Sequence, residues 1–328
     1  MKITVLGSGS WGTAVACLFA DMGHDITLWS YLSTECEALS RDRENKEFLP
    51  GVKIPDTVKF TTDFESLNTA ELIVTAVPSH ATRTTARNIK DKYNGCPILN
   101  ISKGLEQNTL LRLSEVIKSE IPNAVIAVMS GPSHAEEVGR KLPTTNIVAC
   151  EDHKLAKHLQ EQLMSSVFRI YTSDDMIGVE LGGSLKNVIA LCAGICDGLG
   201  FGDNTKAALM TRGIAEISRL GTTMGARRET FSGLSGIGDL IVTCTSMHSR
   251  NRRAGILIGE GMKVSDAIES VHMVVEGFRT ADAAMALSKK YNVEMPICAE
   301  AYKVLFEDKS PKEAVYDLML RDKKSELE

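Results

Sequence analysis

The first half of the chain alternates short apolar runs with segments in which apolar residues recur every three or four positions. Several runs are continuous Val, Ile and Leu stretches, which is typical of parallel strands buried on both faces. Strands are predicted over 2–7, 25–30, 72–78, 97–102, 124–130, 145–150 and 168–172, and helices over 13–22, 34–44, 81–93, 109–121 and 153–165. This alternation predicts a doubly wound α/β sheet.

The first predicted strand runs directly into a glycine motif. Ile3 to Leu6 are followed by Gly7-Ser8-Gly9-Ser10-Trp11-Gly12 and then by a helical pattern. In a strand–turn–helix context the first glycine permits the tight turn, the second lets the backbone approach a pyrophosphate, and the third allows close helix packing. The helix N-terminus then faces the phosphates. The motif therefore predicts a dinucleotide-binding Rossmann domain.

The pattern changes beyond about residue 174, where clear strand signals stop. Helical spacing continues over 176–196, 204–223, 251–259, 264–270, 277–291, 297–306 and 311–320, interrupted by glycine clusters at 198–202 and 233–238. We therefore expect a Rossmann domain over 1–175 and an all-helical domain for substrate binding and dimerisation over 176–328.

Composition excludes several classes of protein. Apolar residues make up 43% of the 328 positions, enough for two cores, and the net charge of −5 argues against a nucleic-acid binder. The eight cysteines include no Cys-x-x-Cys pair and are interpreted as small core residues of a reducing compartment. No signal peptide is predicted, and the longest apolar stretch, around 188–193, is too short to span a bilayer. A soluble, cytoplasmic protein without a metal site is expected.

Two polar clusters follow predicted strands. Lys103, in Asn100–Glu106, lies at the carboxyl end of a central strand, where open α/β sheets bind ligands; it is equally a substrate contact or a solvated turn lysine. In the second cluster Gly131 and Pro132 force a turn, after which Ser133 caps a helix or meets a ligand. His134 is interpreted as a surface or cofactor-side residue in preference to a general base.

Two further clusters lie in the helical half. Lys186 interrupts an apolar helix, so it either needs a partner or reaches to the helix edge; burial would lower its pKa and suit proton transfer. Asp239 follows glycines and is either a helix cap or a site residue. The run Ser249-Arg250-Asn251 opens a helix and suits a phosphate monoester, the alternative being a capped surface helix.

Taken together, these blocks resemble the NAD(P)-dependent sn-glycerol-3-phosphate dehydrogenase family in its soluble bacterial form. The matching blocks are Gly7–Gly12, Ser102-Lys103-Gly104, Ser130–Ser133, Leu185-Lys186-Asn187, Gly236–Leu240, Ser249–Asn251 and Val275-Glu276-Gly277. They fall in the family order from Gly7 to Gly277. The resemblance implies reversible reduction of dihydroxyacetone phosphate to sn-glycerol 3-phosphate, a supply of glycerol 3-phosphate for phospholipid synthesis, and a homodimer.

The resemblance also implies residue roles. Lys186 is expected to be the catalytic acid/base, with Lys103 and Asp239 as neighbours that hold substrate oxygens. The remaining expected substrate contacts are Gly131, Ser133, Ser249, Arg250 and Asn251. The expected cofactor contacts are Gly7, Gly9, Ser10, Trp11, Gly12, Tyr31, Lys103, Ala135, Arg250, Val274 and Glu276.

One position departs from the family pattern. Tyr31 stands where many relatives carry an arginine for the 2′-phosphate of NADP, and no acid ends the second strand to hold an NAD ribose. Arg41 and Arg43 lie further along. NADPH is the expected cofactor, with NADH use as well. Two other interpretations remain at this point: a related dehydrogenase acting on a hydroxy acid or ketopantoate, and a nucleotide-sensing protein without catalysis.

Overall fold

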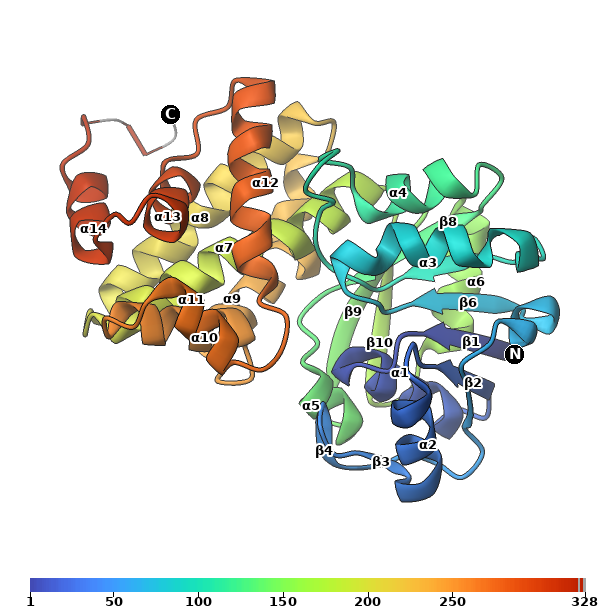
Figure 1. Ribbon diagram of the computed structural model, residues 1–328. Coiled ribbons are helices and arrows are strands. Elements are labelled where there is room, and N and C mark those ends of the chain that lie inside the picture. The colour runs from blue at the N-terminus through green and yellow to red at the C-terminus, as the bar shows by residue number, and fades with distance from the viewer. Residues whose placement is uncertain (324, 327–328) are drawn as a thin grey trace.

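The molecule consists of a sheet with helices on both faces, followed by a cluster of helices (Figure 1). The computed structural model describes residues 1–323, 325 and 326. Positions 324, 327 and 328 of the second expected domain lie outside the described residues. The sheet ends at Ser173 and the first long helix begins at Met176.

The sheet has eight strands, and the seven strand segments expected from the sequence all belong to it. Its spatial order is β10 (Phe168–Ser173), β9 (Thr144–Ala149), β8 (Ile126–Ser130), β7 (Ile98–Asn100), β6 (Leu72–Thr75), β1 (Lys2–Leu6), β2 (Asp25–Trp29) and β5 (Lys59–Thr61). The strands pair parallel except β8 and β9, which are antiparallel.

Three short strands and one strand direction differ from the expectation. Besides β5, the antiparallel pair β3 (Glu44–Asn45) and β4 (Leu49–Lys53) was not predicted, because β3 has only two residues and Pro50-Gly51 within β4 is typical of a turn. The connection from β8 to β9 holds only the five-residue helix α5 (Ala135–Gly139). This returning connection brings β9 back antiparallel to β8, where a long crossover would have made it parallel.

Helices cover the sheet on both faces because its strands are apolar on both sides. Within β1, Ile3 and Val5 belong to one core and Leu6 to the other. The first core includes residues of α1 (Ser10–Asp21), α2 (Ser33–Asp42), α5 and α6 (His153–Leu163). The second core includes residues of α3 (Thr82–Ile89) and α4 (Leu113–Glu120).

The second half is helical around one central helix. Its helices are α7 (Met176–Gly198), α8 (Asp203–Thr223), α9 (Asp239–Thr245), α10 (Arg250–Gly259), α11 (Val264–Ser270), α12 (Glu276–Tyr291), α13 (Pro296–Phe306) and α14 (Pro311–Met319). Of these eight helices, only α9 was not predicted from the sequence. Among the described residues α7 alone is long and apolar enough to cross a bilayer, yet 94% of that window is buried inside the protein. It is therefore the core of the helical domain.

Glycines let α10 lie directly against α7. A Cβ on Gly194 would stand 2.0 Å from the carbonyl oxygen of Arg252, and one on Gly255 would stand 2.1 Å from that of Leu191. No side chain fits into these gaps, so the two backbones are in contact along this stretch. The contact places the first turn of α10 beside Lys186 and its neighbour on α7.

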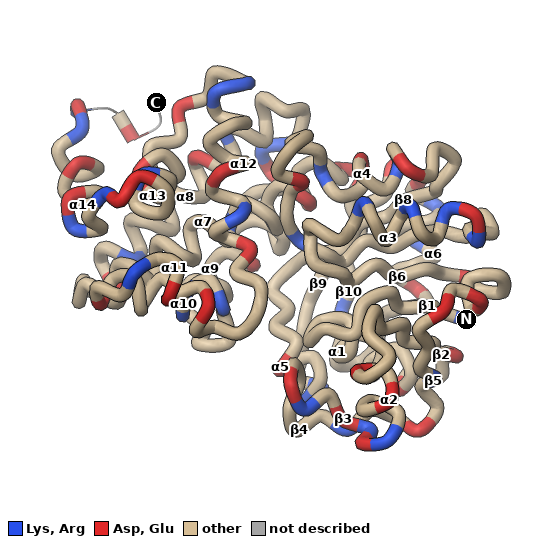
Figure 2. Tube along the Cα trace, in the orientation of Figure 1, with Lys and Arg blue, Asp and Glu red and all other residues tan. Residues whose placement is uncertain are grey.

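Charged residues of both signs are interspersed along both halves of the chain (Figure 2). The described residues contain no cluster of three or more His, Cys, Asp and Glu side chains that could hold a metal ion. All eight cysteines are free thiols, and five of them are buried. Burial raises the pKa of Cys17 to about 12, which keeps that thiol protonated at neutral pH.

Candidate active site

Two lysines from different halves of the chain meet on one buried carboxylate. Lys103 follows β7 and donates from Nζ to Oδ2 of Asp239 at 2.7 Å. Lys186, within α7, donates from Nζ to the other oxygen of the same carboxylate. The side chains of Lys186 and Asp239 are 6% and 1% exposed, against 20% for Lys103. The structure thus brings together three of the residues singled out in the sequence.

Burial and mutual charge set the protonation of this cluster. Burial lowers the pKa of Lys186 to about 8, although the charge of Asp239 opposes that shift and the charge of Lys103 adds to it. Burial raises the pKa of the Asp239 carboxyl, but the two lysines outweigh it and hold that pKa below its usual value. At neutral pH the cluster therefore holds two ammonium groups, one carboxylate and one excess positive charge, a field that suits an anionic ligand.

A threonine not predicted from the sequence completes the surroundings of Lys186. Its Nζ donates to Oγ1 of Thr243 at 2.6 Å, and that hydroxyl donates to the carbonyl oxygen of Asp239 at 2.6 Å. Because the hydroxyl proton is used on the backbone, Thr243 presents a lone pair to the ammonium group. Thr243 follows Asp239 by four positions on α9, a spacing that places both on one helix face. That spacing was the available signal, but α9 itself was not recognised.

The turn after β8 contacts the same cluster. Gly131 has φ of +145°, and its carbonyl oxygen accepts a hydrogen bond from Lys103 Nζ at 3.1 Å and one from Ser133 Oγ at 3.0 Å. A Cβ on Gly131 would lie 2.7 Å from Oδ1 of Asn146, so the turn requires glycine for space as well as for conformation. Burial lowers the pKa of His134, which follows this turn.

The start of α10 lies beside Lys186. Ser249 caps the helix, its Oγ accepting from the backbone N–H of Arg252 at 3.2 Å. Asn251 donates from Nδ2 to Oδ1 of Asn187 at 3.0 Å, and its own Oδ1 accepts from the backbone N–H of Gly277 at 2.8 Å. Asn251 thus links three of the sequence blocks, but both ends of its amide are engaged with the protein.

Arg250 is half-buried at the first helical position, and its guanidinium makes no hydrogen bond or ion pair to any residue that the structure describes. Burial lowers its pKa, while the carboxylates of Glu276 and Glu136 favour the charged form. At a helix N-terminus, both the guanidinium and the free backbone N–H groups can donate hydrogen bonds to a bound anion. This geometry favours the phosphate interpretation of the cluster over a capped surface helix.

The glycine motif forms a cradle that fits a dinucleotide pyrophosphate. Gly7 has φ of +115°, and a Cβ on Gly12 would lie 1.9 Å from the carbonyl oxygen of Gly7. Gly9 is the N-cap of α1, with no side-chain cap, and the space above its Cα is open. The first-turn N–H groups of Ser10 and Trp11 have no intrahelical acceptor, so they remain for a ligand. The residues present therefore fit the cofactor group.

Replacing Gly9 by valine tests this placement. We expect Gly9→Val to abolish cofactor binding while the protein stays folded, because a Cβ at this position meets no protein atom within 4 Å and the valine side chain would occupy the space above the cradle. Calorimetric titration with NADH and NADPH measures the loss, and circular dichroism checks the fold. Gly12→Ala is the contrasting variant, which should destabilise the domain itself. Unchanged affinity in Gly9→Val would contradict the placement.

The remaining expected cofactor contacts come from both halves of the chain. Ala135 begins α5, which packs against α1. Glu276 begins α12 and accepts hydrogen bonds from Ser79, at 3.1 Å from the backbone N–H and 2.7 Å from Oγ, which join α12 to the end of β6. Val274 is half-buried two positions earlier, and Tyr31 is 78% exposed beside the ring of Trp29.

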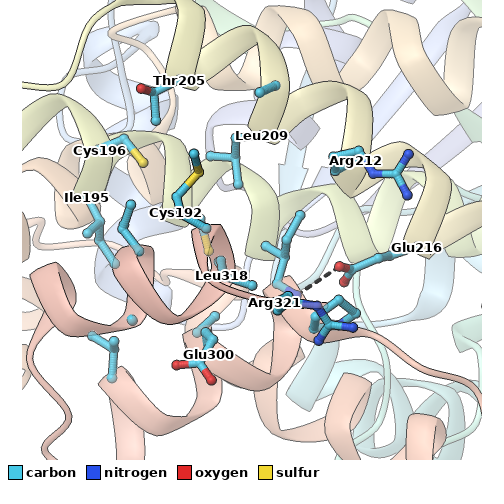
Figure 3. Close-up of a pocket in the computed structure, with 18 of the residues that line it drawn as sticks. Cys192, Ile195, Cys196, Thr205, Leu209, Arg212, Glu216, Glu300, Leu318 and Arg321 are labelled. Atoms are coloured by element: carbon cyan, nitrogen blue, oxygen red, sulfur yellow. Dashed lines mark hydrogen bonds between the residues drawn. The ribbon is translucent and has the colours of Figure 1, made fainter. Parts of the chain in front are cut away.

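A separate cavity of about 610 Å³ lies among α7, α8, α13 and α14, and none of the predicted site residues lines it (Figure 3). Figure 3 shows Cys192 and Leu209 facing its interior. Glu216 at its edge accepts from the backbone N–H of Ile297 at 2.8 Å and caps α13, and burial raises the pKa of that carboxyl to about 7. Its carboxylate is therefore engaged in the fold, away from Lys186.

Comparison with known proteins agrees with this geometry. The family model described as the NAD-dependent glycerol-3-phosphate dehydrogenase N-terminus matches residues 2–156, and that of the C-terminus matches residues 175–316. A glycerol-3-phosphate dehydrogenase [NAD(P)+] of Agathobacter rectalis is 55% identical over 99% of this chain and 97% of its own length. One of Fusobacterium nucleatum is 52% identical over 100% and 99%.

The fold is shared with a solved relative. The crystal structure of glycerol-3-phosphate dehydrogenase from Coxiella burnetii has a TM-score of 0.94 and 40% identity, covering 98% of this chain and 99% of that one. Matches of this extent span both the sheet and the helical half. The chain belongs to the NAD-dependent glycerol-3-phosphate dehydrogenase family.

Proposed function

We propose that the chain catalyses the reversible reduction of dihydroxyacetone phosphate to sn-glycerol 3-phosphate with NAD(P)H. The proposal rests on two features of one site. Lys186 is buried, has a lowered pKa and is paired with Asp239. Arg250, at the start of α10, has no hydrogen-bond or ion-pair partner among the residues that the structure describes. Relatives that match over the full chain are named glycerol-3-phosphate dehydrogenase [NAD(P)+]. One half of this site suits a ketone oxygen and the other suits a phosphate.

Lys186 is the proposed proton donor. When bound, the nicotinamide supplies a hydride to C2 of the substrate. Lys186 gives its Nζ proton to the C2 oxygen, and Asp239 stabilises the ammonium form before transfer. Lys103 places a second positive charge beside that oxygen, which lowers the energy of the developing negative charge. In the reverse direction neutral Lys186 accepts the proton.

The phosphate is proposed to bind at the start of α10. Arg250 supplies the charged donor, and the first-turn backbone N–H groups after Ser249 supply neutral ones. Asn251 orders this turn against α7 through Asn187. Gly131, whose carbonyl oxygen accepts from Lys103 Nζ, and Ser133 are the proposed contacts of the substrate hydroxyl groups.

The pH dependence follows from the direction of the Lys186 shift. We expect kcat/KM for reduction to fall as pH rises through about 8, because the donor loses its proton, and that for oxidation to rise through the same range. Steady-state rates in both directions between pH 6 and about 10 measure both limbs. In Asp239→Asn the fall in kcat/KM for reduction should occur at lower pH, since the carboxylate that raises the pKa of Lys186 is gone. A fall at the same pH as in the wild type would contradict the electrostatic pairing of Lys186 with Asp239.

A single assay separates the proposal from its alternatives. Purified protein is mixed with dihydroxyacetone phosphate and NADPH or NADH, and nicotinamide absorbance is followed. Oxidation of cofactor supports the proposed reaction. Turnover with ketopantoate or a keto acid alone would favour the related dehydrogenases, and cofactor binding without turnover would favour a nucleotide sensor. The positive charge of the Lys103–Asp239–Lys186 cluster, and an Arg250 guanidinium without a partner among the described residues, support the phosphate substrate.

The setting of the enzyme forms part of the same proposal. The division into a dinucleotide-binding unit over 1–175 and a substrate-binding unit over 176–328 is supported by the end of the sheet at Ser173. We place the protein in the cytoplasm as a homodimer that supplies glycerol 3-phosphate for phospholipid synthesis. Sedimentation at micromolar concentration tests the dimer.

A further inference from the structure

The end of β2 carries an acidic residue that the sequence pattern did not place there. Ser30, which directly follows β2, is 1% exposed and donates from Oγ to the carboxylate of Glu35. Glu35 lies in the first turn of α2 and is half-buried. The hydrogen bond therefore folds this carboxylate back onto the end of the strand, although five positions separate the two residues in sequence.

The strand end to which this carboxylate is hydrogen-bonded through Ser30 adjoins the glycine motif. The backbone N–H of Gly7 donates to the carbonyl oxygen of Trp29 at 3.1 Å, so the end of β2 adjoins the first glycine of the cradle. In dinucleotide-binding folds an acid at this strand end accepts the hydroxyl groups of the adenine ribose, and a cation here accommodates a 2′-phosphate. Ser30 engages one of the roughly four lone-pair sites of the Glu35 carboxylate, which leaves acceptors for two ribose hydroxyls.

The arginines that could hold a 2′-phosphate are engaged elsewhere. Arg41 donates from Nε to Asp42 at 2.7 Å. Arg43 donates from Nη1 to the carbonyl oxygen of Val58 at 2.7 Å, and its guanidinium lies 5.0 Å from the ring centre of Phe60. The Arg43 guanidinium is therefore held within the fold, whereas that of Arg41, 72% exposed, pairs with the adjacent Asp42.

The local charge at the start of α2 is negative. Burial raises the pKa of the Cys36 thiol, and the charges of Glu37, Glu35 and Asp63 raise it further. Three carboxylates close enough to act on one thiol also act on any anion bound at the strand end. A 2′-phosphate, which carries up to two negative charges, would be repelled by this field.

We propose that Glu35 is the residue that sets cofactor preference in this chain, and that it makes NADH bind more tightly than NADPH. The inference rests on the proposed function for the cofactor site and concerns the order of affinity between two cofactors of the family. The Glu35 carboxylate accepts hydrogen bonds from the 2′- and 3′-hydroxyls of NADH and repels the phosphate that replaces the 2′-hydroxyl in NADPH.

The test measures cofactor binding directly, in the absence of substrate. Dissociation constants for NADH and NADPH are obtained by calorimetry for the wild type, Glu35→Gln and Glu37→Gln. We expect the wild type to favour NADH by about tenfold or more, and Glu35→Gln to reduce this ratio at least about fivefold by removing one charge. Glu37→Gln is the comparison variant: it removes one charge of the same local field but no acceptor that is hydrogen-bonded at the strand end. Its ratio should therefore fall clearly less than that of Glu35→Gln, and an equal fall in both variants would overturn the specific role of Glu35.

The salt dependence of the affinity ratio is a second test, because a change in packing would not make this ratio depend on ionic strength. Repulsion of the 2′-phosphate at a partly exposed site is screened by salt, so the wild-type ratio should shrink between about 0.05 and 0.5 M salt. In Glu35→Gln the ratio should respond less. A wild type that binds NADPH more tightly, or a ratio that Glu35→Gln leaves unchanged, would overturn the inference. Failure to bind either cofactor would instead overturn the proposed function.

Discussion

Lys186→Met should lower turnover by about a hundredfold to ten-thousandfold, the contribution of a positioned general acid. Methionine keeps the length and apolar character of the lysine stem, which lies in a helix that is buried over almost all of its length. It removes the ammonium group that is proposed to donate the proton, and it leaves Asp239 still paired with Lys103. The loss should therefore lie in kcat, with the cofactor dissociation constant within about twofold of the wild type.

A matched control isolates the chemistry from the loss of a buried ion pair. Lys206 on α8 is also a partly buried lysine, 16% exposed, that pairs with Asp197 at 2.6 Å. Lys206→Met removes a comparable pair, and Asp197 keeps its second partner Arg252. This control should retain near-normal kcat. If Lys186→Met turned over at a similar rate with an intact fold, Lys186 would not be the proton donor.

Arg250→Ala should lower kcat/KM for dihydroxyacetone phosphate by about thirtyfold to a thousandfold, equivalent to about 2–4 kcal/mol of transition-state binding. The guanidinium makes no hydrogen bond or ion pair to any residue that the structure describes, so its removal breaks no such contact of the fold. The lost binding energy should therefore be that between Arg250 and the substrate phosphate. Arg250→Lys keeps the charge but not the two-pronged geometry, and it should give an intermediate value.

Unphosphorylated dihydroxyacetone is the control substrate for Arg250. The wild type should use it poorly, and Arg250→Ala should reduce that low rate by no more than about threefold, because no phosphate contact is left to lose. An equal loss on both substrates would place Arg250 in another role. Thermal unfolding of the variant checks that α10 remains packed on α7.

The pattern along the chain was sufficient for the class of fold and for most elements. Continuous apolar runs identified the buried strands, and the change to helical spacing near Asp174 identified the second half, because side-chain periodicity reflects which faces are buried. The glycine motif was readable because strand, turn and helix are adjacent in sequence. Some short features were missed: β3 and β5 have only two and three residues, and the β-branched run Ile241-Val242-Thr243 in α9 does not favour a helix.

The site was readable only as separate blocks. Lys103 and Asp239 are 136 positions apart, and Lys186 and Asp239 are 53 apart, so no local pattern shows that one carboxylate joins both lysines. The tertiary structure decided this, because the pKa of Lys186 depends on its burial and on charges brought in by other elements.

For the cofactor site, too, the sequence determined one part and the tertiary structure the other. The sequence by itself determined that a dinucleotide cradle opens the chain and that no acid directly ends the second strand. Only the folded backbone decided that Glu35 returns to that position, since a helix turn and one hydrogen bond from Ser30 bring it there. Covalent order determines local conformation through sterics and periodicity, whereas charges and hydrogen bonds act through space, between residues that packing alone makes neighbours.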